Sequence, residues 1–407
     1  MKEEILVRGH NFTAICFSAI ALMLLLGNNY AHSTEVRGVT KDTIKIGVIA
    51  DQTGVAAPVG IPITNATRTY FQNINDQGGI NGRKVKIIVE DDHYTIPGAI
   101  AAFKKLIFRD AVLSVLYTGG TGQTFALMSQ IEKQKVPVIP VSFAEGMTTP
   151  VKRYIFTATA GYDDGLKIIV DYIMKDLKAK KPKIACAYPD VEFGKTGFSA
   201  TKEYLKKYNL EFSATSIINF TEIDATSQVL NLKKSDPDYI ILHDALAGLV
   251  SFFKAAKRYG LRSKVIGSFY VSDEENIKVT GDAMKDALAV SPIGYWSDNS
   301  PGMAELRKIT TKYHPETKWM IRSYIQGWLT SMICAEGLKR AGKNLNPDTL
   351  VEAYEAFKNF STGEISAPVS YSKNNHKGGT MNKLYKVDVK NQTFIPITEF
   401  REPAFKD

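Results

Sequence analysis

Residues 44–54 read Ile-Lys-Ile-Gly-Val-Ile-Ala-Asp-Gln-Thr-Gly, a β-branched run that ends in a polar loop. Such a run is typical of a strand that delivers the chain to a loop. A helical stretch follows from about residue 60 to 75 and stops at Gln77-Gly78-Gly79, where glycine can supply the left-handed C-cap. The stretch therefore predicts the first strand, loop and helix of an α/β layer.

The same alternation continues along the chain. Further strands are predicted at 85–90, 111–117 and 136–141, with helical segments between them. A second alternation predicts strands at 183–188, 216–220, 239–243, 264–268 and 287–291, with helices near 164–178, 195–208, 225–234 and 246–259. Connections of a dozen or more residues make such strands parallel. Two Rossmann-like α/β lobes are predicted, and a ligand cleft is expected where the carboxyl ends of their strands meet.

The chain is predicted to pass between the lobes three times. Helices near 301–313, 322–341 and 347–358 are expected to return to the first lobe, and paired strands within 383–397 to cross back to the second. The three crossings predict a three-stranded hinge near 157–162, 290–294 and 366–372, with Trp296 placed to report closure. The predicted N-terminal lobe is 42–157 and 292–368, and the C-terminal lobe is 158–291 and 369–400.

The N-terminus has the pattern of a secretion signal. Lys2 and Arg8 precede a mainly apolar run from Phe12 to Leu26, and small residues follow it. The run is shorter than the roughly 20 residues that span a bilayer, although an uncleaved anchor remains the alternative. We predict a signal peptide over residues 1–33, cleavage after Ser33, and a periplasmic protein. Cys16 lies inside the run, which argues against lipoprotein anchoring.

Composition excludes several classes of function. The 407 residues predict two domains of ordinary size. The net charge of +9 has no accompanying nucleic-acid motif, so the basic runs indicate solvated faces. Cys186 and Cys334 lack metal-ligand spacing and indicate either two buried thiols or one long-range disulfide. No Gly-x-Ser-x-Gly or His-Glu-x-x-His pattern occurs, so neither an enzyme nor a cofactor or metal is expected.

A glycine-rich loop closes the third predicted strand. Residues 117–124 read Tyr-Thr-Gly-Gly-Thr-Gly-Gln-Thr and open a helix, so free backbone N–H groups and hydroxyls face the expected cleft. The loop lacks the lysine of a phosphate-binding P-loop. It predicts a seat for a carboxylate or carbonyl oxygen, with a ligand-free helix start as the alternative.

Aromatic residues follow two strands of the second lobe. Phe193 follows the strand that ends at Tyr188, and Phe269 and Tyr270 follow the strand that ends at Ser268. Such residues suit an apolar ligand or ordinary packing. His243 ends a strand and is either structural or directed at the cleft.

Several motifs resemble one known family. They are Ile46-Gly47-Val48, residues 75–82 (Asn-Asp-Gln-Gly-Gly-Ile-Asn-Gly), Asp91-Asp92 and Arg340-Ala341-Gly342. Over about residues 42–398 the chain resembles the periplasmic branched-chain amino-acid-binding proteins of ABC transporters. The resemblance implies a type I periplasmic binding protein, a monomer whose lobes close on a small ligand and dock on a membrane permease.

The resemblance also implies contacts for the ligand. Thr121, with Gly122 and Thr124 beside it, corresponds to the residues that bind the ligand carboxylate. The next strand-end loop corresponds to Ser142-Phe143-Ala144. The Tyr-Gly of the family matches Phe193-Gly194, and an aromatic contact of the family falls near Ala245, where it is lost.

One departure concerns the ligand ammonium. The family pairs the ammonium with a glutamate, and Phe269 stands in its place here, followed by Tyr270. A buried ammonium without a partner costs several kcal/mol, so an α-amino acid is disfavoured unless Asp244 or Asp273 substitutes. We therefore expect a small organic acid with an apolar or aromatic skeleton. The alternatives are a binding protein for branched-chain or aromatic amino acids, amides or urea, a secreted enzyme, and the sensor module of a receptor.

Overall fold

The computed structural model describes residues 36–405, and the predicted signal peptide over 1–33 lies outside the described residues. The first sheet is parallel throughout, with strand order β2-β1-β3-β4. Its strands are β1 (Thr43–Ile49), β2 (Lys84–Glu90), β3 (Ser114–Tyr117) and β4 (Val138–Pro140). The helices that connect them are α2 (Ala57–Asp76), α3 (Ile96–Lys104) and α4 (Thr121–Gln134). This sheet is the predicted first α/β lobe.

The second sheet has strand order β11-β10-β9-β8-β7-β5-β6. The strands β5 to β9 pair in parallel, while β10 pairs antiparallel with both β9 and β11. The strands are β5 (Ile184–Tyr188), β6 (Phe212–Ile217), β7 (Tyr239–Leu242), β8 (Lys264–Gly267), β9 (Leu288–Ser291), β10 (Lys383–Asp388) and β11 (Thr393–Pro396). The helices are α5 (Tyr162–Asp171), α6 (Glu192–Leu205), α7 (Thr226–Lys234), α8 (Leu246–Arg258) and α9 (Glu274–Thr280).

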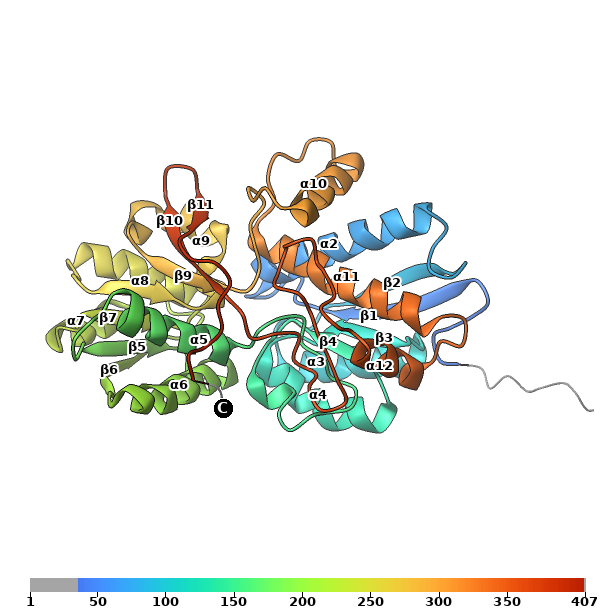
Figure 1. Cartoon of the computed structure of the whole chain (residues 1–407), viewed down its shortest axis with the longest axis horizontal. Helices are drawn as coiled ribbons and strands as arrows, with labels where there is room; N and C mark the ends of the chain where they lie inside the picture. Colours follow the sequence, from blue (N-terminus) through green and yellow to red (C-terminus); the bar gives the residue numbers. More distant parts are fainter. Residues whose placement is uncertain (1–35, 406–407) are drawn as a thin grey trace, which may run out of the picture. The chain divides into compact units, whose positions relative to one another are not determined.

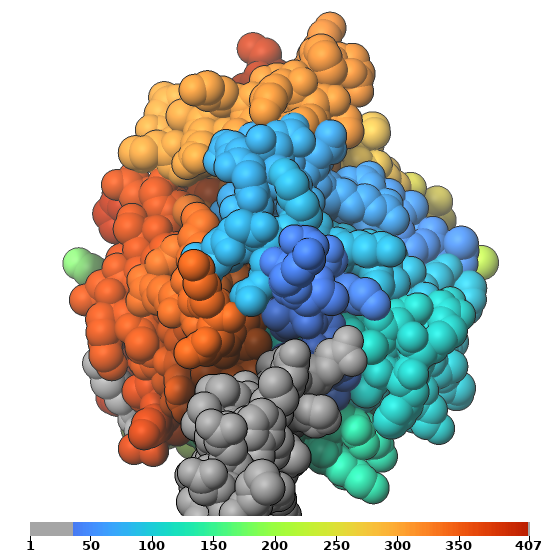
Figure 2. Space-filling model, turned by 90° about the vertical axis from the view of Figure 1, so that its right-hand side faces the viewer, coloured from blue at the N-terminus to red at the C-terminus, as the bar shows by residue number. Residues whose placement is uncertain are grey.

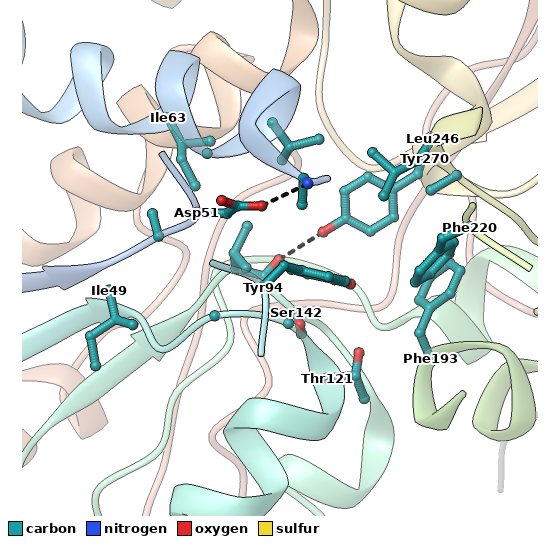
Figure 3. A pocket seen from close by; sticks show the side chains of 18 of the residues that line it. Ile49, Asp51, Ile63, Tyr94, Thr121, Ser142, Phe193, Phe220, Leu246 and Tyr270 are labelled. Atoms are coloured by element: carbon teal, nitrogen blue, oxygen red, sulfur yellow. Dashed lines mark hydrogen bonds between the residues drawn. The ribbon is translucent and has the colours of Figure 1, made fainter. Parts of the chain in front are cut away.

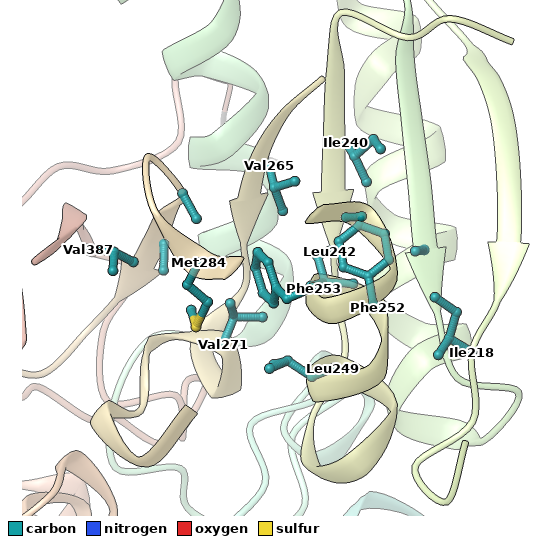
Figure 4. Close-up of a cluster of buried hydrophobic side chains, with 14 of the residues drawn as sticks. Ile218, Ile240, Leu242, Leu249, Phe252, Phe253, Val265, Val271, Met284 and Val387 are labelled. Carbon is teal, nitrogen blue, oxygen red and sulfur yellow. The ribbon is translucent and has the colours of Figure 1, made fainter. Parts of the chain in front are cut away.

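Apolar side chains cover the second sheet on both faces. One face packs against α7, α8 and α9 through a cluster that includes Leu242, Phe252 and Met284 (Figure 4). The other face packs against α5 and α6 through a cluster that includes Leu166 and Ile241. A parallel strand buried on both faces reads as a continuous apolar run, which is why the strands of this sheet were visible in the sequence.

Three later helices join the first sheet. They are α10 (Pro301–Tyr313), α11 (Arg322–Ala341) and α12 (Pro347–Glu355). Helix α11 packs along α2, and Figure 1 shows both on one side of the first sheet with α3 and α4 on the other. Figure 2 shows these blue and orange segments side by side on one face. The chain then returns to the second sheet as β10 and β11, as predicted.

The connections between the sheets differ from the predicted three-stranded hinge. Among the described residues the connections form isolated bridges, Thr157 with Lys377 and Ile293 with Ser366, and no regular strand spans 157–162 or 366–372. Residues 366–372 still pair with other residues near the first sheet, and the last crossing comes after Lys377. Pro368 and the Gly378-Gly379 pair interrupt this segment, because proline cannot donate to a ladder and glycine weakens a strand.

Other boundaries also differ. Strand β6 spans Phe212–Ile217 instead of the predicted 216–220. It is an edge strand in which polar and apolar residues alternate, so the sequence lacks a continuous apolar run there, and the prediction was placed on the apolar residues at its end. Helix α9 was not predicted.

Cys186 and Cys334 are free buried thiols, so the disulfide alternative is wrong. Within residues 36–405 no helix is long and apolar enough to cross a membrane.

Candidate ligand cavity

A cavity lies where the carboxyl ends of the strands of both sheets converge (Figure 3). The space among its lining atoms is about 560 Å³, which includes space open to solvent. Its lining is mainly apolar and consists of Ile49, Ala50, Asp51, Ala56, Val59, Gly60, Ile63, Tyr94, Gly119, Gly120, Thr121, Val141, Ser142, Tyr162, Phe193, Phe220, Ala245, Leu246 and Tyr270.

Helix α4 begins at the cavity wall. Its N-cap is Gly120, and no side chain caps its first turn. The chain reaches this point through left-handed backbone at Tyr117 (φ 72°), Thr118 (φ 26°) and Gly119 (φ 69°). The positive end of the helix and the Thr121 hydroxyl are thereby directed at the cavity (Figure 3). Such a terminus favours an anionic group.

Thr124 and Gly122 support this loop without lining the cavity. The Thr124 hydroxyl lies 2.9 Å from the Thr118 hydroxyl and donates to the Gly120 carbonyl at 2.9 Å. The predicted ligand contact of Thr124 is thus replaced by a contact that holds the loop. Gly122 lies in the first turn of α4, outside the lining.

Gly120 allows Tyr94 to pack against the loop. A Cβ atom at residue 120 would lie 2.8 Å from both Cε2 and the hydroxyl oxygen of Tyr94. A side chain on residue 120 would therefore displace the Tyr94 ring, which lines the cavity. Burial raises the pKa of Tyr94, so its hydroxyl stays neutral.

Three further hydroxyl groups, those of Ser142, Tyr162 and Tyr270, line the same cavity as Thr121. Tyr162 donates to the Tyr270 hydroxyl at 3.4 Å, and Tyr270 donates to the Val141 carbonyl at 3.3 Å. Burial raises the pKa of both tyrosines, and the Ser142 hydroxyl interacts with Tyr162. Both tyrosines stay protonated at neutral pH, and each already donates its single hydroxyl proton within the protein, so a ligand oxygen would have to replace one of these acceptors.

Aromatic rings form the wall from the second lobe. The centroid of Phe193 lies 5.1 Å from that of Tyr162, 5.8 Å from that of Phe220 and 5.6 Å from that of Tyr270. Tyr94 from the first lobe lies 6.1 Å from Phe220. These separations are typical of packed aromatic pairs. The rings surround an apolar or aromatic ligand skeleton.

The carboxylates near the cavity are engaged or turned away. Asp51 lines the cavity, but its oxygens accept from the backbone N–H groups of Thr53, Gly54 and Ala56. Asp92 lies behind Gly119, and burial raises its pKa to about 6. The second Asp92 oxygen has no hydrogen-bond partner among the described residues.

Neither of the predicted substitutes for the family glutamate lines the cavity. Asp244 is buried, accepts from the Ala245 N–H at 2.7 Å, and directs its other oxygen toward Gly248. Burial raises the pKa of Asp244 well above its usual value. Asp273 accepts from the Ser323 hydroxyl at 2.6 Å and from Arg322 at 3.3 Å.

A buried arginine covers the back of the aromatic wall. The guanidinium carbon of Arg322 lies 3.8 Å from the centroid of Phe269 and 5.4 Å from that of Tyr270. The Arg322 backbone N–H donates to Glu274 at 2.7 Å. Because α11 packs on α2 while α9 packs on α8, this cluster joins the two lobes. Phe269 is therefore a packing contact of Arg322 and does not line the cavity.

His243 is structural. Its ring nitrogens lie 2.8 Å from the Ser268 hydroxyl and 2.9 Å from the Phe193 carbonyl oxygen. Burial lowers its pKa to about 4, so the ring is neutral at physiological pH. It holds Phe193 in place from behind.

The structure brings part of the predicted site together. The predicted residues that line the cavity are Thr121, Ser142, Phe193, Ala245 and Tyr270, and those outside the lining are Gly122, Thr124, Phe143, Ala144, Asp244 and Phe269. Sequence reasoning missed Tyr94, Tyr162, Phe220 and Leu246. Tyr94 and Phe220 follow strands β2 and β6, so their strand-end position was the available signal. Tyr162 begins α5 at the end of the predicted crossing 157–162, so its place next to a crossing was the available signal.

Comparison with known proteins agrees with this fold. The family described as periplasmic binding protein matches residues 43–393. The chain belongs to this periplasmic binding protein family. Its relatives are solute-binding proteins of ABC transporters, so it is a binding protein and not an enzyme, and the family implies a periplasmic location.

Particular relatives are distant. The Leu/Ile/Val-binding protein of Escherichia coli K12 is 23% identical over 62% of this chain and 69% of its own. A Pseudomonas aeruginosa protein that binds leucine, isoleucine, valine, threonine and alanine is 22% identical over 77% of this chain and 83% of its own.

Solved structures share the fold. A branched-chain amino acid ABC transporter protein from Thermus thermophilus with bound valine gives a TM-score of 0.83 at 20% identity, over 90% of this chain and 98% of its own. A fatty acid ABC transporter substrate-binding protein from Thermomonospora curvata gives 0.82 at 23% identity, over 91% and 95%. This likeness concerns the fold, with two lobes as predicted.

Proposed function

We propose that the protein captures a small organic acid with an apolar or aromatic skeleton in this cavity and delivers it to a membrane permease. The observation that carries the proposal is the uncapped N-terminus of α4 at the wall of a mainly apolar cavity. The helix end supplies partial positive charge, and the aromatic walls supply an apolar surface.

The carboxylate would bind at the first-lobe wall. The free N–H groups of the first turn of α4, the Thr121 hydroxyl and the Ser142 hydroxyl can donate to its oxygens. The hydroxyls of Tyr162 and Tyr270 also line the cavity in their neutral form, and would donate to the ligand by turning from their present acceptors. A carboxylate in this position exchanges water for charge-assisted hydrogen bonds, which are stronger than neutral ones.

An ammonium group finds less support. Asp51 lines the cavity, but its oxygens already accept backbone N–H groups. Asp273 is paired with Arg322, and Asp244 lies outside the lining. A zwitterion would therefore bury its ammonium without a free carboxylate to pair with. The free energy of desolvating that charge would exceed the free energy gained from contact with the apolar walls.

An amino-acid ligand is the second candidate. The names of the Escherichia coli and Pseudomonas aeruginosa relatives favour it, since both bind amino acids. In this case the ammonium would have to face Asp51, the carboxylate on the cavity wall.

Matched ligand pairs separate the two candidates. We would titrate the protein by calorimetry with 3-phenylpropanoate against phenylalanine, and with 4-methylpentanoate against leucine. We expect the acids without an amino group to bind more tightly. If only the amino acids bind, the proposed ligand class is wrong.

A substitution tests the head-group site. Thr121→Val should weaken acid binding by about tenfold or more, because a hydrogen bond to a charged group contributes about 1.5–3 kcal/mol. Thr226→Val is the matched control, since Thr226 also begins a helix and lies outside the cavity lining. Equal affinities for the two variants would contradict the assignment of Thr121.

A further inference from the structure

A second hollow adjoins the ligand cavity. It is lined by residues of the α2 start, the loop after β6, α8 and α9. We call it the outer groove. The cavity and the outer groove share the lining residues Val59, Ala245, Leu246 and Tyr270. These four residues therefore form the wall between the two spaces.

The outer groove gathers exposed apolar side chains. Ile223 is 89% exposed, Val55 is 49% exposed and Val279 is 47% exposed, and all three line the groove. Single exposed apolar residues are ordinary, whereas a group of them along one groove marks a surface that contacts something apolar. They come from elements of both lobes, so an occupant would touch both.

The charged groups that line the groove balance in sign, with Lys254 and Arg322 positive and Asp273 and Glu275 negative. Arg322 pairs with Asp273 at 3.3 Å, and Glu275 pairs at 3.5 Å with Lys278, which lies outside the lining. The lining therefore has little net charge to attract an ionic group. The apolar side chains then define the chemistry of the occupant.

Leu246 stands at the shared wall in an unfavourable conformation. Its φ is 61°, in the left-handed region that branched residues rarely adopt, and it is the first residue of α8. Strained residues of this kind often lie at binding sites. Leu246 lines the ligand cavity (Figure 3) and also the outer groove.

We infer that the outer groove receives the hydrocarbon tail of the ligand, so that the ligand class is an elongated monocarboxylate with an alkyl or arylalkyl chain. The inference rests on the proposed function, which places the carboxylate at α4. The tail passes the wall at Leu246 and continues along Val55, Ile223 and Val279. The four lining residues that the groove shares with the cavity favour the tail as occupant over a separate partner.

A chain-length series tests the inference. Straight-chain acids from butanoate to decanoate would be titrated below their aggregation concentrations. Affinity should keep rising by about fourfold per methylene beyond the length that fills the cavity, the factor that corresponds to burial of one CH₂ group. A rise that stops at a short chain would overturn the inference while leaving the proposed function in place.

A groove substitution provides the matched comparison. Val279→Asp should reduce the affinity gained per methylene for the longer acids. Ile395→Asp is the control, because Ile395 is 49% exposed on β11 and lies outside both linings. Equal chain-length dependence in the two variants would overturn the inference. The inference would also be overturned if Val279→Asp converted a dimer to a monomer without changing the chain-length dependence, because a second copy of the chain would then occupy the groove.

A variant of the wall opens the path. Leu246→Gly removes the side chain that separates the two spaces, and glycine adopts the left-handed conformation without strain. We expect the variant to favour long acids over short ones relative to the natural protein. If long acids lose as much affinity as short ones, the tail does not pass this wall. If no acid binds either the natural protein or any of the variants, the proposed function itself is refuted.

Discussion

The buried cluster of Arg322, Asp273 and Glu274 supports one quantitative prediction. Arg322 is fully buried, and its guanidinium lies 3.3 Å from Asp273 and 3.8 Å from the Phe269 centroid. We predict that Arg322→Met lowers the free energy of unfolding by about 3–5 kcal/mol, the usual cost of removing one partner of a buried ion pair. Methionine keeps much of the volume, so the lost charge dominates.

The predicted cost depends on pH. Burial and the neighbouring Asp273 raise the pKa of Glu274 well above its usual value, and Arg322 opposes this shift. Without Arg322 the Glu274 pKa rises further. A carboxyl whose pKa is higher in the folded state contributes most stability below its unfolded pKa, and loses it as pH rises through the folded pKa. The cost of the substitution should therefore grow as pH rises through the range between the folded-state Glu274 pKa of the natural protein and the higher one of the variant.

Urea unfolding followed by both far-ultraviolet circular dichroism and tryptophan fluorescence measures this cost. Coincident transitions from the two probes would justify a two-state treatment. Arg109→Met is the control, because Arg109 is 64% exposed while it pairs with Asp110 at 3.1 Å, and exposed pairs contribute about 0–1 kcal/mol. If Arg322→Met costs no more than Arg109→Met, the cluster does not stabilise the junction of the lobes.

Three further predictions follow from single contacts. Gly120→Ala should lower the free energy of unfolding by about 1–3 kcal/mol and weaken ligand binding, because the new Cβ would lie 2.8 Å from Tyr94. Gly122→Ala is the control and should be neutral or stabilising, because a Cβ there has no neighbour nearer than 3.8 Å. Equal changes in melting temperature for the two variants would contradict this. Burial lowers the pKa of His243 to about 4, below its unfolded value of about 6.5. The neutral ring therefore contributes its full stability above pH 6.5, and the free energy of unfolding falls by about 3 kcal/mol as pH drops to 4. The variant His243→Gln should not show this part of the loss. Cys186 and Cys334 should react with a thiol reagent only after unfolding, since both are buried, and fast labelling of the native protein would refute their burial.

Much of the architecture was predictable because it depends on local patterns. The apolar runs at 44–50 and 239–243 are strands buried on both faces, and the glycines at 78 and 79 end α2 as predicted. Position after a strand was enough to place Thr121 and Phe193 at the cavity wall. The hinge was less predictable, since its bridges depend on which distant segments meet.

The amino-acid sequence by itself determined the two α/β lobes, the return of the chain to each, and the glycine-rich loop that opens α4, because these follow from periodicity, turn residues and connection length. Only the tertiary structure decided which side chains share the cavity. Tyr94 and Tyr162 join it from segments 68 residues apart, while Phe269 is drawn away to pack on Arg322. The reason is physical: which of several strand-end side chains faces the ligand depends on packing between segments far apart in the chain, and no local pattern records that packing.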